Sequence, residues 1–220
     1  MLFRSSYPDF RLVASTDGFE VKGLAYPGRE ANYDCNSQVP SGNHNDRTIY
    51  YVFGRYPAEP DGDSYPVLDL VVCHGDFLNV GCVRKQKKNG GRAKAYESFG
   101  GMLIRGRKRY VAPTPFALTV GTAHNQTLIL PTGFRVDSRF RGVGSLVRCE
   151  PEKLVIGYAF DTRANTLVPH CVDNPTAGRE HSFSAFRLKG VSGEEVALRP
   201  PAECSEARAW DEPDVRVAWS

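Results

Sequence analysis

The sequence predicts an all-β protein, a sandwich or barrel of short antiparallel strands, and three observations support this fold class. Short apolar runs rich in β-branched and aromatic residues recur along the chain, as half-buried strands require. The 21 Gly and 15 Pro residues supply turns between these runs. Helical periodicity is scarce, and the spacing of the runs is typical of a sandwich or barrel rather than of βαβ units.

The strands are expected where such apolar runs are bounded by Gly, Pro, Asn or Asp. In chain order they are FRLVAS (10–15), RTIYYVFG (47–54), PVLDLVVC (66–73), GMLIRG (101–106), FALTVGT (116–122), QTLIL (126–130), GSLVRC (144–149), KLVIGYAF (153–160) and FSAFRL (183–188). At most one short helix is expected, in PAECSEARAW (201–210) near the C-terminus. Segments 25–46 and 57–65 are rich in turn-forming residues, so they are predicted to be long loops.

The chain length bounds the domain organisation. With 220 residues, the chain fits a single domain over 1–220 with a sizeable core. The alternative is a two-lobed arrangement of 1–78 and 79–200, followed by a tail over 201–220.

Positive charge is concentrated in the middle of the sequence. The stretch 83–110 has ten Lys or Arg among 28 residues, and Glu97 is its one acidic residue. From Arg84 to Arg148, fourteen basic residues face two acidic ones, a net charge of +12, whereas the rest of the chain carries fourteen basic and 23 acidic residues, a net −9. Such segregation indicates an oriented molecule with one face for an anionic partner.

Two hairpins are predicted to carry this charge. Asn89-Gly90 favours a tight turn in a β-ribbon over 79–99, and Gly106 separates the two arms of a second basic cluster. A further group of arginines, at 135, 139, 141 and 148, adds a third basic patch. The predicted polyanion-binding residues are Arg84, Lys85, Lys87, Lys88, Arg92, Lys94, Arg105, Arg107, Lys108 and Arg109.

The sequence does not assemble a recognisable catalytic or metal site. Six cysteines form no CxxC pair, and we expect all six to be free thiols, with Cys73, Cys149 and Cys171 buried as small hydrophobes. The spacings of His and Cys match no established zinc pattern, so neither a metal nor a cofactor is expected. A hydrolase or nuclease using His74 or His124 is kept as an alternative.

Two segments resemble known families. The opening LFRSSYPDFRLV (2–13) resembles the N-termini of short proteins encoded near phage capsid genes, which implies a virion-associated structural protein. The segment GSLVRC…KLVIGYAF…LVPHCV…GREHSFSAFRL (144–188) resembles one DM-nine repeat of invertebrate lectins. That second resemblance implies carbohydrate binding.

Together these observations favour a non-enzymatic structural or binding protein whose basic hairpin faces a polyanion, with nucleic acid the leading ligand. A virion or another nucleoprotein assembly, with neighbouring protein subunits, fits this interpretation. A carbohydrate-binding module is the alternative of a different class, supported by Tyr50, Tyr51, Tyr56 and Tyr65. The sequence shows no secretory signal and no membrane-length apolar run, so we expect an intracellular or virion location without a membrane partner.

Overall fold

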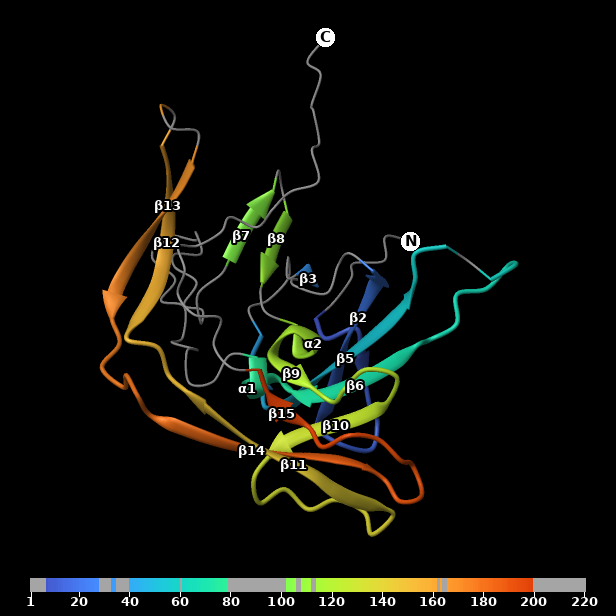
Figure 1. The fold of residues 1–220 in the computed structure, drawn as a ribbon. Helices are drawn as coiled ribbons and strands as arrows, with labels where there is room; N and C mark the ends of the chain where they lie inside the picture. Colours follow the sequence, from blue (N-terminus) through green and yellow to red (C-terminus); the bar gives the residue numbers. More distant parts are fainter. Residues whose placement is uncertain are drawn as a thin grey trace.

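A computed structural model gives the fold (Figure 1), and it describes residues 7–27, 33–34, 40–59, 61–78, 102–105, 108–111, 114–161, 163 and 166–199. Strands make up most of the regular structure, which confirms the all-β class. The predicted helix over 201–210 and the predicted ribbon over 79–99 lie outside the described residues.

The described residues build one large mixed sheet with the order β1-β2-β5-β6-β10-β14-β11, and β4 pairs with β5 beside this path. β6 pairs with β10, so this sheet takes strands from both sides of residue 78. Its eight strands are β1 (Phe10–Arg11), β2 (Asp17–Tyr26), β4 (Asn43–His44), β5 (Arg47–Pro57), β6 (Asp69–His74), β10 (Gln126–Pro131), β11 (Phe140–Cys149) and β14 (Glu180–Leu188).

The pairing in this sheet corrects one prediction. The β2–β5 and β6–β10 pairs are parallel, whereas purely antiparallel strands were expected. Parallel neighbours need a long crossover between them, and a tight hairpin cannot join them. The chain provides such crossovers between β2 and β5 and again between β6 and β10. The remaining pairs of the sheet are antiparallel.

Three smaller sheets and two helices complete the described fold. β3 (Tyr33–Asp34), β8 (Lys108–Val111) and β7 (Met102–Arg105) form one sheet, in that order. β12 (Lys153–Asp161) pairs with β13 (Thr166–Asp173), and β15 (Ala197–Leu198) pairs with β9 (Thr119–Val120). The helices are α1 (Gly75–Leu78) and α2 (Pro115–Leu118).

The two helices correct the expectation of at most one helix near the C-terminus. α2 occupies the start of the segment 116–122 that was predicted to be a strand. The Thr114 hydroxyl accepts a hydrogen bond from the Ala117 N–H at 3.2 Å, and Pro115 stands at the first helical position. A Thr cap followed by Pro favours helix initiation, and this local signal outweighs the strand propensity of the apolar residues that follow.

The strand predictions differ from the structure near the N-terminus and at β13, a strand that was not predicted. The predicted strand over 10–15 is limited to β1, and Leu12 and Val13 after it are exposed. The ten-residue strand β2 was not predicted, because Gly18 and Glu20 occupy inward positions where a strand normally places apolar side chains. The predicted loop 25–46 contains the short strands β3 and β4.

The hydrophobic core lies on one face of the main sheet. Strand β5 alternates buried Ile49, Tyr51 and Phe53 with partly exposed neighbours, the period of two expected for a strand with one buried face. Tyr33 of β3 packs edge-on against the Phe53 ring, with ring centroids 4.9 Å apart. The other strands, the two helices and the segment before β15 contribute Leu24, Val71, Cys73, Phe77, Leu78, Phe116, Ile129, Val143, Leu146, Phe183, Ala185 and Val196.

One long β-ribbon runs from the main sheet into a separate hairpin. β11 pairs with β14 inside the sheet, and their continuations β12 and β13 pair with each other beyond it (Figure 1). Glu150 is buried where the ribbon leaves the main sheet. Its carboxylate contacts three other side chains at this junction. One oxygen lies 2.7 Å from His181 Nε2, and the other accepts hydrogen bonds from the Thr176 hydroxyl and the Asn174 side-chain amide.

From the contacts of Glu150 we predict that the folded protein loses stability in acid. Burial opposes ionisation of Glu150, but the hydrogen bonds from Thr176, His181 and Asn174 outweigh it and hold the pKa of Glu150 below its ordinary value. A lowered folded-state pKa stabilises the fold fully above the unfolded pKa of about 4.3, and this stabilisation is lost as the pH falls through the folded pKa. We therefore expect the E150Q variant to lose less stability than the wild type between about pH 5 and pH 2. Urea unfolding at a series of pH values measures this, and parallel curves for the two proteins would contradict it.

Candidate functional site

The structure describes only some of the basic residues that were predicted to bind a polyanion. Arg84, Lys85, Lys87, Lys88, Arg92 and Lys94 lie outside the described residues, as does the Asn89-Gly90 turn. Arg107 is also outside them. Arg105, Lys108 and Arg109 belong to described strands, where backbone pairing gives their positions.

β7 and β8 form an antiparallel hairpin in which Arg105 is the register partner of Lys108, and Ile104 is the partner of Arg109. Gly106 and Arg107 are the residues between these arms, as the sequence predicted. The hairpin is joined to the core through β3, because Tyr33 pairs with Val111 of β8 and its side chain is buried. Arg105, Lys108 and Arg109 therefore belong to the ends of β7 and β8 that face each other across residues 106 and 107 in sequence, and the neighbouring strand β3 is anchored in the core.

The third predicted patch is largely engaged in contacts within the chain. The exposed Arg139 lies 2.9 Å from Asp137, and Arg141 Nη2 donates to the Val191 carbonyl at 2.7 Å. Arg148 donates to the Phe77 carbonyl, and its guanidinium lies 5.6 Å from the centre of the Phe77 ring. These arginines make contacts within the chain, so the prediction of a basic surface rests mainly on the hairpin residues.

His74, one of the two candidate catalytic histidines, is enclosed by the fold. Its Nδ1 accepts a hydrogen bond from the Asp76 N–H at 3.3 Å, and the rings of Tyr50 and Phe134 pack edge-on against it. Burial lowers the pKa of His74 below its ordinary value, and the nearby Asp76 carboxylate offsets only part of this effect. The Asp76 carboxylate also accepts the Gly42 N–H at 2.8 Å, so the pair connects α1 with the chain before β4.

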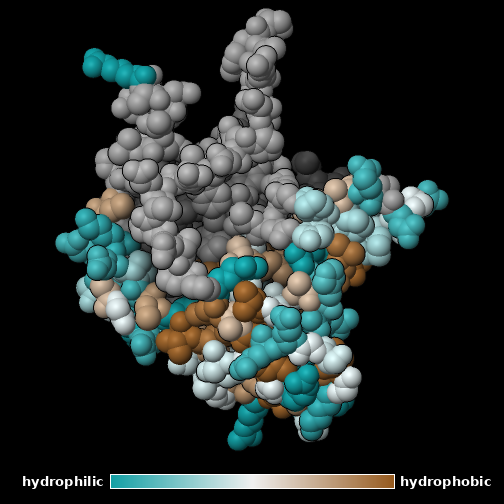
Figure 2. All heavy atoms as spheres, viewed as in Figure 1, coloured by the Kyte–Doolittle hydropathy of each residue, from teal (hydrophilic) through white to brown (hydrophobic). Residues whose placement is uncertain are grey.

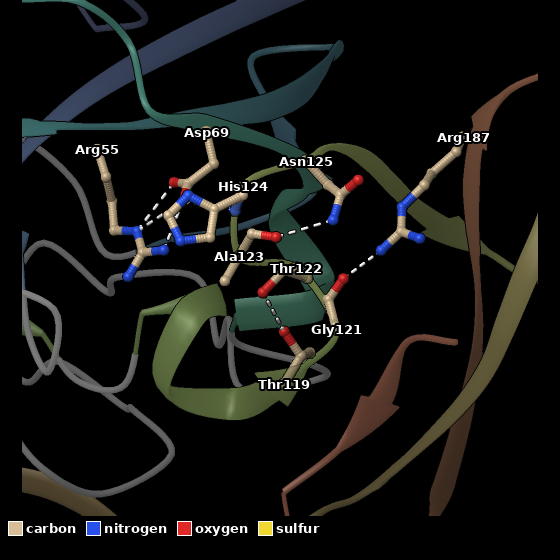
Figure 3. A network of polar contacts seen from close by, with 9 residues as sticks. All are labelled: Arg55, Asp69, Thr119, Gly121, Thr122, Ala123, His124, Asn125 and Arg187. Atoms are coloured by element: carbon tan, nitrogen blue, oxygen red, sulfur yellow. Dashed lines mark hydrogen bonds and ion pairs between the residues drawn. The ribbon is translucent and has the colours of Figure 1, made fainter. Parts of the chain in front are cut away.

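His124, the other candidate, stands in a loop between β9 and β10 that is attached to a buried ion pair (Figure 3). The ion pair joins Arg55 of β5 to its register partner Asp69 of β6, with Arg55 Nε at 2.9 and 3.0 Å from the two carboxylate oxygens. Asp69 also accepts the His124 backbone N–H at 3.1 Å. His124 is itself exposed, with a positive φ of 55° that few non-glycine residues adopt.

The Arg55 guanidinium is further held between two aromatic rings. It lies 4.5 Å from the centre of the Tyr26 ring of β2 and 4.5 Å from that of Phe116 of α2. Cation–π contacts of this kind are stronger where water is excluded. Arg55 and Asp69 therefore connect β2, β5, β6, α2 and the His124 loop at one end of the sheet.

A second buried arginine holds the other side of the same loop (Figure 3). Arg187 of β14 is fully buried and donates to the carbonyls of Gly121 and Glu194. Gly121 has a φ of +78°, and a Cβ placed on it would lie 2.2 Å from the Glu195 carbonyl oxygen, so this position requires glycine. Within the loop, the Thr119 and Thr122 hydroxyls are 3.1 Å apart and the Asn125 amide donates to the Ala123 carbonyl at 2.8 Å.

Sequence reasoning did not identify Arg55, Asp69 or Arg187, although a signal was present. Arg55 continues the alternation of Ile49, Tyr51 and Phe53, so its side chain had to face the core. Asp69 and Arg187 stand in the same phase as the buried residues of their strands. A charged residue in the buried phase of a strand predicts a buried, compensated charge.

The remaining candidate chemistry is dispersed. In the part of the chain that the structure describes, no three His, Cys, Asp or Glu residues gather in a group that could hold a metal ion. Cys73, Cys149 and Cys171 are free thiols, but of these three only Cys73 is buried. Cys149 at the end of β11 and Cys171 within β13 are exposed, contrary to the expectation of burial. The tyrosines suggested for sugar binding do not share one surface, since Tyr51 is in the core and Tyr56 packs against Tyr65.

Comparison with known proteins adds no assignment: no family, no curated protein and no solved structure matches this chain. Within the described residues, none of the helices has the length and apolar character needed to cross a membrane.

The Arg55–Asp69 pair yields a stability prediction. D69N keeps an acceptor for the His124 N–H but leaves a buried guanidinium without its counter-charge, so we expect a loss of about 3–5 kcal/mol of unfolding free energy. The double variant R55M/D69L removes both charges and should lose less than D69N alone. Urea denaturation at neutral pH measures both effects. R139Q, which breaks the exposed pair with Asp137, is the control and should leave stability nearly unchanged. A D69N protein as stable as R139Q would show that the buried pair is dispensable.

Proposed function

We propose that this protein is a non-enzymatic binding protein that presents its basic β7–β8 hairpin to a polyanion, nucleic acid foremost, within a larger assembly. The observation that carries the proposal is the register of that hairpin. Arg105 and Lys108 are directly paired partners, Arg109 is the next residue of β8, and Arg107 lies between the arms in sequence. Four basic residues are thus concentrated around one turn.

Electrostatics favours an anionic partner for such a cluster. Like charges brought together repel, so the arrangement destabilises the free protein unless an anion compensates it. The described residues of β7 and β8 contain no Asp or Glu, and the preceding stretch 84–94 adds six further Lys and Arg residues. Clustered Lys and Arg suffice for phosphate binding, and the guanidinium group suits bidentate phosphate contacts.

Two features support a binding role rather than catalysis. The ring of His74 is enclosed between Tyr50 and Phe134 and is hydrogen-bonded by the backbone of Asp76. His124 has no acidic side chain hydrogen-bonded to its ring among the described residues; the contact with Asp69 is made by its backbone N–H. The Asp76 carboxylate lies 3.6 Å from the His74 ring, but among the described residues no Ser, Thr or Cys side chain is hydrogen-bonded to either imidazole as a nucleophile would be.

The salt dependence of binding tests the proposal. Each neutralised phosphate contributes about 0.9 to the slope of log affinity against log salt on duplex DNA. We expect R105Q/R107Q/K108Q/R109Q to bind a mixed-sequence DNA duplex more weakly than wild type, with a slope smaller by up to about 3.6. Fluorescence anisotropy between about 50 and 200 mM salt measures it.

The matched control is R135Q/R139Q, which removes two exposed arginines away from the hairpin, one of them already paired with Asp137. This variant should change the slope much less. The thermal unfolding midpoint is compared for all three proteins, because a collapse in the hairpin variant would mean that its basic residues are structural. Equal slopes for the hairpin variant and the control would exclude the hairpin as the binding surface.

A further inference from the structure

A groove of about 490 Å³ opens beside the His124 loop, at the end of the main sheet where β6 and β10 begin and β14 ends. Its lining residues are Val67, Leu68, Asp69, Leu70, His124, Asn125, Gln126, Leu188 and Val191.

The walls of the groove are apolar and open to solvent. Val67 is 66% exposed, Val191 40% and Leu188 38%. Val67 precedes β6, whereas Leu188, the last residue of β14, and Val191 belong to the turn at the end of that strand. Hydrophobic atoms reach the surface in patches among polar ones on the described part of the molecule (Figure 2). Exposed apolar side chains that converge on one concavity mark a binding surface more often than a scattered set does.

The polar part of the groove presents amide and imidazole groups to solvent. Asp69 is the one carboxylate among the lining residues, and its charge is compensated by the buried Arg55. Asn125 and Gln126 supply side-chain amides, and the exposed His124 adds an imidazole. Side-chain amides offer donors and acceptors together, which matches the N–H and C=O of a peptide group.

The polar groups are held on a rigid loop. Asp69 binds the His124 N–H, Arg187 binds the Gly121 carbonyl, and the Leu70 N–H donates to the Asn125 carbonyl at 3.0 Å. The backbone of His124 is kept in the left-handed region by these contacts. Such strain is tolerated where the surroundings determine the conformation, and it is concentrated at ligand-binding loops. A preorganised loop reduces the entropy lost on binding.

We propose that this groove binds an extended, uncharged segment of a partner protein, with one aliphatic side chain between Val67, Leu188 and Val191 and its flanking peptide groups on the amides of Asn125 and Gln126. A polyanion fits less well, because no Lys or Arg is among the described residues that line the groove. A sugar fits less well, because no Phe, Tyr or Trp is among the described residues that line the groove. The groove therefore provides a second contact surface, independent of the basic hairpin.

N-acetyl-leucinamide is the probe, since it combines one aliphatic side chain with two neutral peptide groups. Its affinity follows from chemical-shift titration of the full chain, and we expect a dissociation constant on the order of millimolar. The shifts should centre on Gln126, Asn125 and the His124 ring. L188D should abolish saturable binding, and Q126A should weaken it several-fold.

V147D is the matched control, because Val147 is 41% exposed on β11 and does not line the groove. It should bind the probe as wild type does. N-acetyl-aspartamide and methyl glucoside are titrated in parallel. The proposal is overturned if the protein binds the charged probe or the sugar more tightly than N-acetyl-leucinamide. It is also overturned if L188D and V147D lose the same amount of probe affinity, or if no saturable shift appears at any soluble probe concentration. None of these outcomes depends on DNA binding, so failure here and failure of the hairpin proposal are distinguishable.

Discussion

Asp69 places a carboxylate on the inward face of the main sheet, and much of the surrounding structure compensates that buried charge. Arg55 meets it from the neighbouring strand, and Tyr26 and Phe116 enclose the guanidinium. The backbone N–H of His124 donates one more hydrogen bond to the carboxylate. Removing two charges from water costs several kcal/mol per ion, so such a pair is tolerated only when further hydrogen bonds satisfy it. The position of the His124 loop is thus a consequence of the charge beneath it.

The need to compensate buried charge also explains which inward positions of the main sheet are apolar and which are charged. Its middle is apolar, with Ile49, Val71 and Ile129 fully buried. At one end the inward positions become Arg55, Asp69 and Arg187, and the loop 119–125 contributes backbone groups that hydrogen-bond Asp69 and Arg187. Asp69 and Arg187, the two charged residues that hold the loop, belong to different strands. A change in the spacing between β6 and β14 would therefore break one of the loop's two attachments. This geometry makes the groove beside His124 a rigid feature of the sheet rather than of a loop alone.

The fold class followed from the sequence because period-two apolar patterns survive in most of the strands. β5, β10 and β14 show that pattern clearly, and their predicted positions overlap the observed ones. β2 was not predicted because its inward side chains include Glu20. α2 was not predicted because the apolar residues after Pro115 match a strand pattern, although the Thr114 cap and Pro115 initiate a helix there. Parallel pairing is a property of distant segments, which no local pattern encodes. The buried charged residues could be predicted only from their position in the alternating pattern of their strands. The convergence of Val67, Leu188 and Val191 on one groove depends on tertiary contacts, which the sequence pattern does not show.

The two proposed surfaces differ in how the core supports them, and this difference bears on what each can bind. The basic hairpin is joined to the core through one neighbour, β3, whose Tyr33 is buried against Phe53. Such an attachment fixes the base of the hairpin, while salt-dependent phosphate contacts need little precision at its turn. The groove lies directly on the ends of three core strands, and its polar groups are fixed by buried ions on both sides. Recognition of a neutral segment requires that precision, because shape and hydrogen-bond direction replace charge as the source of specificity. The two proposed contacts, a polyanion held by charge and a neighbouring protein held by shape, are the two kinds of contact that a nucleoprotein assembly needs.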